Sequence, residues 1–354
     1  MNSLSRYFPL SKKIPIDKFI SNVLYSKNFG YYSKKIPFGK NGDFITAPGI
    51  SSLFSESIAI WIILLWEHLD KPKIFNIIEL GPGEGQMCRT LIRIFKRFPI
   101  FSKSVKIFLY EKSKTLKNLQ KKSLEGENVK WVNSFNKIKK GPVVFLGNEF
   151  FDAIPIKQFT KINNTWYEKY VKLENNSKIK TFLKKAKSKD IFELKKYNLL
   201  KSQSFVEFPK QGFAELDLIV RSIKKLSGVL LLADYGFLKQ KSKNTLQSVK
   251  DHKKNNIFHN IGNADITSLV NFHLIKNYLA KKKLSVNNIV TQEFFLKKMG
   301  IINRAEMVSK RMNFKEKSDL YLRVQRLINP TQMGELFKFL SAFKLKKKIS
   351  FGFY

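Results

Sequence analysis

The chain has 354 residues, 43% of them hydrophobic, and a formal net charge of +39 from 66 Lys+Arg against 27 Asp+Glu. This length and apolar content predict a folded globular protein with one large α/β unit or two smaller domains. A charge of this size favours nucleic acid, an anionic membrane or an acidic protein surface as a partner. Because the lysines are spread along almost the whole chain, we interpret most of them as solvated surface residues and keep nucleic acid as the competing partner.

Cysteine and histidine usage limits the chemistry of the chain. Cys88 is the only cysteine, so an internal disulfide is impossible and nothing indicates an oxidising compartment. The four histidines lack the spacing of a zinc site, and we predict no metal.

The most apolar run, Ile58 to Trp66, is much shorter than the roughly 20 residues of a membrane-spanning helix, and it predicts a buried helix. The N-terminus lacks a long apolar stretch before a cleavage site, so we expect no secretory signal and a cytoplasmic location.

Residues 1–73 predict a helical N-terminal segment. Apolar residues from Ile16 to Lys27 have helical spacing, and Gly30 follows where a helix can end. The stretch from Pro37 to Pro48 is punctuated by glycine and proline and predicts a loop. This loop leads into the apolar helix around Trp61.

Residues 74–235 alternate between short apolar runs and segments with helical spacing. Ile74 to Leu80 predicts a strand, Gly81 to Gly85 a glycine turn, and Gln86 to Phe98 a helix. Further strands are predicted at Val105 to Tyr110, Val129 to Val132, Pro142 to Leu146 and Gly228 to Asp234, with helices at Ser113 to Leu124, where Ser113 is the N-cap, and at Phe213 to Leu226. The alternation predicts an α/β fold, a Rossmann-like, mostly parallel sheet with helices on both faces.

The remaining segments predict accessory structure. Gln158 to Val171 has the pattern of a hairpin that turns at Asn163-Asn164. Residues 172–201 are lysine-rich and weakly patterned, and we expect a surface insertion there. From residue 236 to 354 we expect a polar loop, a helix after Thr267, a second helix around Phe295 and helical segments to the end, as a helical region that completes the same catalytic unit.

The sharpest chemical signal is the loop that contains Gly81, Pro82, Gly83 and Gly85. Glycines let the backbone turn tightly at the end of a strand and let a ligand approach closely, and the following helix N-terminus offers N–H groups. This setting suits the carboxylate of a methionyl group or a phosphate. The dinucleotide fingerprint has its third glycine one position later than Gly85, which argues against NAD.

Two glutamates flank this loop. Glu111 follows the second strand directly, where a carboxylate can accept hydrogen bonds from both hydroxyls of a ribose, and we favour this role over an ordinary surface glutamate. Glu79 could bind the ammonium group of the cofactor or cap the turn, and both roles stay open. Together with the loop, Glu111 favours S-adenosylmethionine as the cofactor.

The segment from Asn148 to Pro155 is a candidate acceptor site, since it follows a strand whose carboxyl end would face the cofactor. A guanidinium acceptor has a pKa above about 12 and delocalised nitrogen lone pairs, so carboxylates are needed to fix its plane and hold its charge away from the attacking nitrogen. We assign Glu149 and Asp152 to this task and Asn148 to orientation. The alternatives are a cap for Asp152 and a core position for the phenylalanines, which we favour for Phe151.

Several segments in order carry a family resemblance: Gly30 to Tyr32, Asn41 to Pro48, Glu79 to Gly85, Asn148 to Pro155, Asp234 to Gly236, Ala264 to Thr267, Thr291-Gln292 with Met299-Gly300, and Met333 to Glu335. The chain resembles the MidA-like methyltransferases, the group that includes the mitochondrial complex I assembly methyltransferase and its bacterial relatives. The resemblance implies a class I methyltransferase core, S-adenosyl-L-methionine as cofactor, and dimethylation of an arginine in a respiratory complex I subunit.

The same resemblance implies that Gly42, Asp43 and Thr46, in a G-D-F-x-T segment, fold over the cofactor. From the residues alone this segment is an ordinary glycine turn before a proline. The chain departs from the family pattern at Gly49, Glu84 and Thr90, where glutamate, arginine and aspartate are usual. These departures bear on the identity of the acceptor and on activity.

Three functions therefore compete. The first is a protein arginine methyltransferase, the second an RNA methyltransferase that uses the +39 charge, and the third a non-catalytic assembly factor that keeps the fold and binds a partner. We rank them in this order. Incorporation of labelled methyl groups into protein or into RNA separates them.

Overall fold

The computed structural model describes residues 4–8, 13–34, 45–174, 178–201, 203–239 and 242–354. Its centre is a mixed sheet that runs, from one edge to the other, through β4 (Val129–Trp131), β3 (Val105–Tyr110), β2 (Phe75–Leu80), β5 (Val143–Asn148), β10 (Gly228–Phe237), β17 (Phe337–Lys344) and β15 (Ser285–Val286). Two short strands extend it, β14 (Val270–Asn271) beside β10 and β16 (Val290–Thr291) beside β17. The strands from β4 to β10 are parallel, which confirms the predicted α/β sheet.

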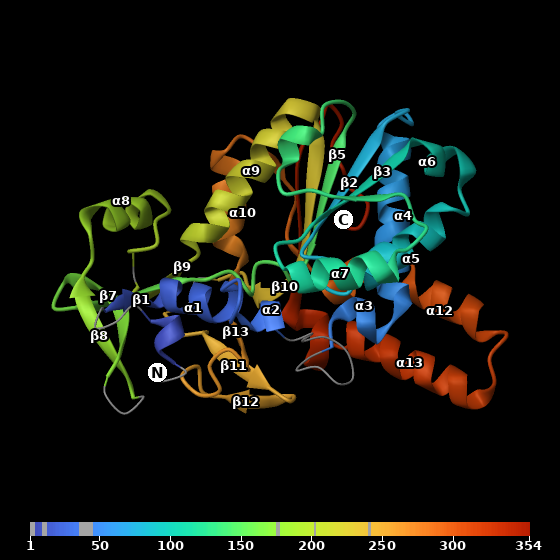
Figure 1. The fold of residues 1–354 in the computed structure, drawn as a ribbon. Helices are drawn as coiled ribbons and strands as arrows, with labels where there is room; N and C mark the ends of the chain where they lie inside the picture. The colour runs from blue at the N-terminus through green and yellow to red at the C-terminus, as the bar shows by residue number, and fades with distance from the viewer. Residues whose placement is uncertain (1–3, 9–12, 35–44, 175–177, 202, 240–241) are drawn as a thin grey trace.

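Helices cover both faces of this sheet (Figure 1). One face packs against α4 (Ser52–His68), α5 (Gln86–Phe95), α6 (Pro99–Ser104), α11 (Gln292–Lys298), α12 (Ile301–Ser309) and α13 (Phe314–Ile328). The other face packs against α9 (Lys210–Leu226) and α10 (Phe272–Lys281). Strand β10 illustrates the reason: Val229 and Leu231 join the first core and Leu230 and Leu232 the second, because side chains alternate along a strand. A strand buried on both faces is therefore apolar along most of its length.

The carboxyl edge of the parallel strands is bordered by four further helices. These are α1 (Ile16–Tyr25), α2 (Tyr31–Lys34), α3 (Ala47–Ile50) and α7 (Lys114–Ser123). The predicted N-cap of α7 is confirmed, since the Ser113 side chain accepts a hydrogen bond from the Leu116 N–H. The same hydroxyl donates to the Tyr32 carbonyl over 2.6 Å, and this bond joins α7 to α2.

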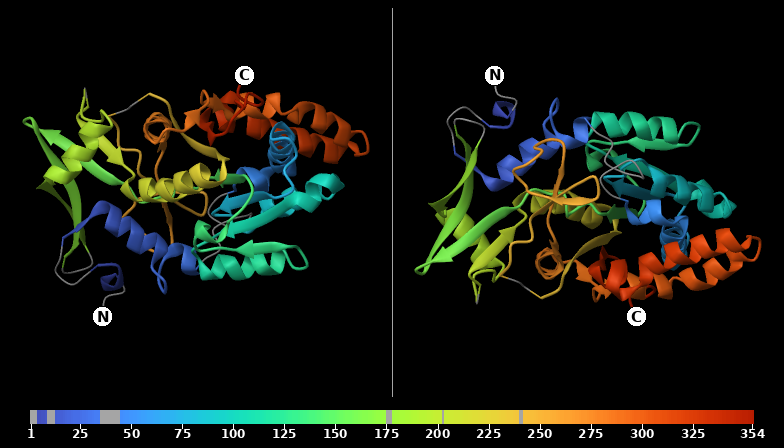
Figure 2. Two further views of the ribbon diagram at one scale, coloured as in Figure 1. Left: turned by 90° about the horizontal axis from the view of Figure 1, so that it is seen from above. Right: turned by 90° about the horizontal axis from the view of Figure 1, so that it is seen from below.

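A second, antiparallel sheet lies on the side of the molecule opposite α12 and α13 (Figure 2). It contains β1 (Ile14–Pro15), β7 (Thr165–Leu173), β6 (Lys157–Ile162), β9 (Phe205–Phe208) and β8 (Ile179–Lys185). The predicted hairpin is confirmed: Ile162 pairs with Thr165, and Asn163 and Asn164 have φ of 43° and 61°. Two central residues with positive φ form the type I′ turn that fits the twist of a hairpin.

The lysine-rich insertion has more structure than its sequence pattern indicates. Residues 172–201 contain β8, which pairs with β7, and α8 (Ser188–Lys196). Most of β8 is exposed, as expected of a surface insertion, but Leu194 and Leu199 are buried in the core. The apolar pattern of residues 172–201 is weak because β8 and α8 bury only a few of their side chains.

The polar loop expected after Gly236 also has regular structure. It contains a small antiparallel sheet of β11 (Gln247–Lys250), β12 (Lys253–Asn255) and β13 (Asp265–Thr267). Ile261 and Ile266 pack there against the apolar face of α1. Strands this short, with one apolar residue in β11, one in β13 and none in β12, leave almost no periodic signal in the sequence.

The expectation of helical segments to the end of the chain is wrong for residues 337–344. These residues form β17, which pairs antiparallel with β10 from Phe337 to Lys344. Phe339 and Phe343 face one core, and Leu340 and Ala342 face the other. A short run that is apolar on both faces cannot be told from a buried helix by its period. The main sheet therefore extends beyond the predicted core of residues 74–235.

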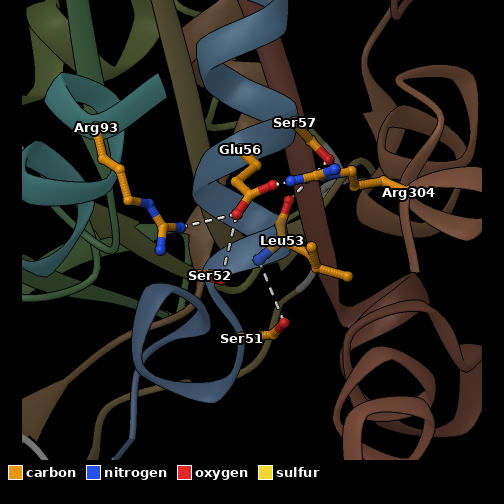
Figure 3. Close-up of polar contacts among 7 residues, drawn as sticks. All are labelled: Ser51, Ser52, Leu53, Glu56, Ser57, Arg93 and Arg304. Carbon is orange, nitrogen blue, oxygen red and sulfur yellow. Dashed lines mark hydrogen bonds and ion pairs between the residues drawn. The ribbon is translucent and has the colours of Figure 1, made fainter. Parts of the chain in front are cut away.

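A buried carboxylate ties the C-terminal helices to the core (Figure 3). Glu56 of α4 is 7% exposed, and its two oxygens each lie 2.8 Å from an arginine, Arg93 of α5 and Arg304 of α12. Helix α4 is apolar on all sides, as predicted for a buried helix, so Glu56 is an exception that needs both partners. The contact fixes α12, and through it α13, beside the sheet.

None of the helices within the described ranges combines the length and the apolar character needed to cross a membrane.

Candidate active site

A cavity of about 990 Å³ lies at the carboxyl ends of β2, β3 and β5. Its volume is at the upper end of the range for small-molecule sites, about 300–1,000 Å³, and leaves room for a cofactor together with an acceptor side chain. Most of the predicted site residues line it: Thr46, Glu79, Gly81, Pro82, Gly83, Glu111, Asn148, Glu149 and Asp152. Gly85 does not line it, and Gly42 and Asp43 lie outside the described residues.

The glycine loop turns as its composition predicts. Gly81, Gly83 and Gly85 have φ of 59°, 55° and 81°, in the region that side chains with a Cβ rarely adopt. Gly85 is the N-cap of α5, so it shapes the turn and contributes no surface to the cavity. A Cβ on Gly81 would lie 3.1 Å from the Phe150 ring, which itself lines the cavity. The loop thus combines a tight turn with close packing against the acceptor segment.

Glu111 is held at the end of β3 by two donors. Its Oε1 accepts the Ser113 N–H over 2.7 Å, and its Oε2 accepts the Gln120 side chain over 3.3 Å. Burial raises the pKa of the Glu111 carboxyl, and these hydrogen bonds oppose the rise. Gln120 also donates to the Gly83 carbonyl over 2.8 Å and accepts from Trp131, so it locks Glu111 to the glycine loop. Each carboxylate oxygen has a second lone pair with which to accept a ribose hydroxyl.

Glu79 lies in β2 directly before the glycine loop and is 3% exposed. Its Oε2 is buried and has no hydrogen-bond partner among the described residues. Burial raises the pKa of Glu79 to about 8, and a hydrogen bond from the Cys88 backbone N–H opposes the rise. A buried carboxylate that lines a cavity with one oxygen unpaired is a site for a cation.

The acceptor segment begins with a residue in a strained conformation. Glu149 has φ of 50°, which costs on the order of 1 kcal/mol for a residue other than glycine. Its backbone N–H donates to Ala233 over 2.9 Å. Its Oε1 accepts from Ala47 N–H and from the Asn148 side chain, both over 3.3 Å. Burial raises the pKa of Glu149 to about 8, and the charge of Asp152 adds to the rise.

Asp152 and Asn148 complete the acceptor segment. Tyr235 donates its hydroxyl to Asp152 Oδ2 over 2.6 Å, which leaves Oδ1 buried and without a partner among the described residues. Burial raises the pKa of Asp152 to about 6. Asn148 Oδ1 is likewise buried and unpaired within the described residues. The core position favoured for Phe151 is confirmed, since its side chain is 5% exposed and packs in the core.

Asp234 shapes this segment, although no role was predicted for it from the sequence. Its Oδ2 accepts the N–H groups of Phe151 and Asp152 over 2.9 and 3.3 Å, and its Oδ1 accepts the Tyr235 N–H over 2.9 Å. Burial and the charge of Asp152 raise the pKa of Asp234 well above its ordinary value. The only sequence signal for this role is the position of Asp234 at the end of a core strand.

Two tyrosines border the cavity on the side of α1 and α2. Tyr25 and Tyr32 are stacked with ring centroids 5.5 Å apart, and both line the cavity. Tyr25 donates to the Ala153 carbonyl over 2.8 Å, and Tyr32 donates to the Asp265 carboxylate over 3.2 Å. Asp265 begins strand β13 and accepts the Tyr32 hydroxyl there. Both rings therefore add aromatic surface to the wall of the cavity.

The charges around the cavity are segregated by depth. The carboxylates of Glu79, Glu111 and Asp152 are buried, whereas the basic residues of the lining are exposed on its rim. These rim residues are Lys27, Lys112, Lys114, Arg323 and Arg326. The interior of the cavity is thus acidic in a chain with a net charge of +39. No group of three metal-ligating side chains is placed to hold a metal ion in the described part of the chain.

Two of the three departures from the family pattern lie at the cavity. Gly49 lines it, and a Cβ there would lie 3.1 Å from the Gln86 side chain. Glu84 also lines it and accepts a hydrogen bond from the same Gln86 over 2.8 Å. Thr90 lies on α5 and does not line the cavity.

The strand order, the glycine turn and the ligand-sized cavity define an enzyme of the Rossmann-like methyltransferase class. A family described as "Putative S-adenosyl-L-methionine-dependent methyltransferase" matches residues 57–290. The chain belongs to this family of S-adenosyl-L-methionine-dependent methyltransferases, as the resemblance in its sequence predicts.

Named relatives cover nearly the whole chain. "Protein arginine methyltransferase NDUFAF7, mitochondrial" of Xenopus laevis is 27% identical over 93% of this chain and 80% of its own length. The human protein of the same name is 28% identical over 93% of this chain and 79% of its own length. A Burkholderia thailandensis crystal structure with S-adenosyl-homocysteine bound has a TM-score of 0.79 at 22% identity and covers 97% of this chain and 89% of its own. A native crystal structure from the same organism has a TM-score of 0.81. These two structures support the fold.

The residues of the cavity fit the cofactor of this family. S-adenosyl-L-methionine carries an ammonium, a carboxylate, two ribose hydroxyls and an electrophilic methyl group on a positive sulfur. The unpaired oxygen of Glu79 suits the ammonium, the start of α5 suits the carboxylate, and the fixed carboxylate of Glu111 suits the hydroxyls. The individual roles of these residues remain predictions.

Proposed function

We propose that this methyltransferase modifies an arginine side chain of a protein. One observation carries the proposal: next to the strained Glu149, two buried acceptor oxygens, Asn148 Oδ1 and Asp152 Oδ1, have no partner among the described residues. A buried polar atom without a hydrogen bond costs about 1–3 kcal/mol. A guanidinium has five N–H donors and no acceptor, so it satisfies such a set without adding an unpaired group of its own.

In this proposal, the residues of the acceptor segment have different roles. Glu149 and Asp152 bind N–H groups of the guanidinium, fix its plane and hold its positive charge away from the attacking nitrogen. Asn148 orients Glu149 through their 3.3 Å hydrogen bond, and Tyr235 orients Asp152. The attacking nitrogen loses one proton during the transfer. Glu149 is our candidate base: its pKa of about 8 favours the protonated form at pH 7 in the free protein, and a bound guanidinium lowers that pKa so that the carboxylate can accept the proton.

The names of the curated relatives support arginine as the acceptor, and the family resemblance in the sequence supports a respiratory complex I subunit as the first protein to test. RNA is the second candidate because of the +39 charge. The buried carboxylates around the cavity argue against it, since phosphates would meet acidic side chains there. The third candidate, a non-catalytic assembly factor, predicts weak or absent cofactor binding. We further propose a cytoplasmic location, which cell fractionation tests.

The decisive experiment follows labelled methyl groups. The protein is incubated with labelled S-adenosyl-L-methionine and a lysate of its own cell, and label is measured in protein and in RNA. We expect label in protein, released as methylarginine on hydrolysis. Glu149→Gln should lose about 10²-fold or more of the transfer rate and keep its affinity for S-adenosyl-homocysteine. Label that enters RNA alone, or an unchanged rate in this variant, would contradict the proposal.

A second variant tests the cofactor loop. Gly83 has φ of 55°, and a β-branched side chain is a strong outlier there. Gly83→Val should therefore drive the loop out of this conformation and weaken S-adenosyl-homocysteine binding by about five- to thirtyfold in calorimetry, since the left-handed conformation costs about 1–2 kcal/mol. Equal affinities of Gly83→Val and the wild type would show that the loop does not bind the cofactor.

A further inference from the structure

The rim of the cavity has a chemistry of its own. Arg323 and Arg326 stand on α13, which packs beside α3 at the cavity (Figure 1), and both are exposed and line it. Lys27 follows α1, Lys112 precedes α7 and Lys114 begins it, on other sides of the same cavity. Exposed cations thus border the cavity, Lys112 among them in an ion pair with Glu215, while the carboxylates of Glu79, Glu111 and Asp152 are buried.

Two of these cations are arginines in a chain that uses lysine for most of its positive charge. Arginine has a rigid fork of donors that matches a carboxylate in two places, whereas lysine acts as a point charge. Two other arginines, Arg93 and Arg304, each contact one oxygen of the buried Glu56 carboxylate. Arg323 pairs within its own helix with Asp319 over 2.7 Å, and Arg326 has no acidic partner among the described residues. Arg326 is therefore available to a partner carboxylate.

The net charge imposes a second condition on the substrate. A protein of charge +39 repels an arginine-rich segment at long range, so an isolated cationic side chain approaches the acidic interior against the field. A segment in which acidic residues flank the arginine removes this conflict. Its acids meet the rim while its guanidinium enters the cavity.

We propose that the rim, led by Arg323 and Arg326, binds acidic residues that flank the methyl-acceptor arginine. This inference rests on the proposed arginine methylation and names its substrate class: a protein segment with an arginine between aspartates or glutamates. The interior selects the cationic acceptor and the rim selects its anionic neighbours. The exposed cations and the buried carboxylates of one cavity thus recognise two features of the same segment, its acidic flanks and its arginine.

The experiment measures peptide binding in the presence of S-adenosyl-homocysteine, by fluorescence anisotropy at low and at physiological ionic strength. Two labelled peptides share a central arginine, and their flanks carry either Asp and Glu or Asn and Gln. We expect the acidic peptide to bind about tenfold more tightly than the neutral one, with a difference that shrinks as salt rises. Equal affinities, or no binding of either peptide, would overturn the inference.

Two double variants of equal charge locate the effect. Arg323→Glu with Arg326→Glu should reduce binding of the acidic peptide about tenfold, as expected for two exposed ion pairs. The matched control, Arg311→Glu with Lys315→Glu, changes two exposed residues that do not line the cavity, and it should change binding less than twofold. Equal losses in both double variants would assign the preference to the overall field and would refute a role of the rim.

Two further measurements separate this inference from the proposed function. Both double variants should keep the wild-type affinity for S-adenosyl-homocysteine in calorimetry, because neither changes the glycine loop or Glu111. Cofactor binding with no preference for the peptide with acidic flanks would contradict this inference alone. Label that enters RNA alone would contradict the proposed function. An RNA oligonucleotide that displaces the acidic peptide, and that loses affinity only in the α13 variant, would assign the rim to nucleic acid instead.

Discussion

Replacement of Glu79 by glutamine tests whether Glu79 binds the ammonium group of the cofactor, because this contact should release protons from the protein. With a pKa of about 8, Glu79 is about 90% protonated at pH 7 in the free protein. An ammonium within about 4–6 Å lowers a carboxyl pKa by about 1–3, so bound S-adenosyl-homocysteine brings Glu79 to a pKa near 6. Binding should then release about 0.8 proton at pH 7 and about 0.5 at pH 8. This ligand keeps the ammonium and lacks the sulfonium charge, so the release reports Glu79.

The assay is calorimetry in buffers of different ionisation enthalpy, where the slope of the observed heat gives the number of protons released. Glu79→Gln should bring the slope close to zero and weaken binding, because the amide has no charge to oppose the ammonium. Glu149→Gln is the control and should keep the wild-type slope. An equal slope in Glu79→Gln and the wild type would refute the assignment of the ammonium to Glu79.

The raised pKa of Glu79 also predicts that the stability of the protein falls as the pH rises. The pKa of Glu79 is raised on folding, so its contribution to stability is fully present below the unfolded value of 4.5 and is lost as pH rises through the folded value of about 8. By pH 7 the loss amounts to at most about 3 kcal/mol at about 1.4 kcal/mol per pH unit. Glu79→Gln should therefore flatten the fall in melting temperature between pH 5 and pH 8. A wild-type fall that the variant keeps would show that another group causes it.

Three further variants test other contacts. Glu56→Gln should lower the free energy of unfolding by about 1–3 kcal/mol, because Arg93 and Arg304 lose their charged partner while their own side chains, 54% and 35% exposed, stay partly hydrated. A loss below about 0.5 kcal/mol in urea denaturation at pH 7 would contradict this role. Asp234→Asn should lower kcat about tenfold or more with little change in cofactor affinity, since the N–H groups it holds belong to the acceptor segment; a change in cofactor affinity alone would place Asp234 elsewhere. Glu111→Ala should weaken S-adenosyl-homocysteine binding by about 1.5–3 kcal/mol in calorimetry, the worth of hydrogen bonds to a charged group, and unchanged binding would exclude the ribose role.

The cofactor half of the site could be predicted because its signals are local. A strand, a run of glycines and a helix occur in one short stretch, and Glu111 follows the next strand directly. Parallel strands bring their carboxyl ends to one edge of a sheet, so the topology alone places Glu79, Glu111 and Glu149 around one space. The cavity that all three line confirms this expectation of shared location.

The supporting residues could not be predicted because their contacts are distant in sequence. Gln120 lies in a lysine-rich helix and looks like a surface residue, yet it is fully buried and bridges Glu111 to the glycine loop. Tyr25 carries no pattern that indicates a contact with Ala153, 128 residues away. Strand β17 was missed for a related reason, since its partner β10 lies about a hundred residues earlier and its own apolar run fits two structures.

The distribution of charge explains how one protein can combine a cationic surface with a site for cations. Burial raises the pKa of Glu79, Glu149 and Asp152, so the free protein holds these groups at a cost that cationic ligands offset. At long range the net charge dominates and disfavours such ligands, whereas inside the cavity the nearby carboxylates dominate because little water screens them. Approach to the site and recognition within it therefore depend on different residues. The rim governs the encounter, and the buried carboxylates govern which side chain is held.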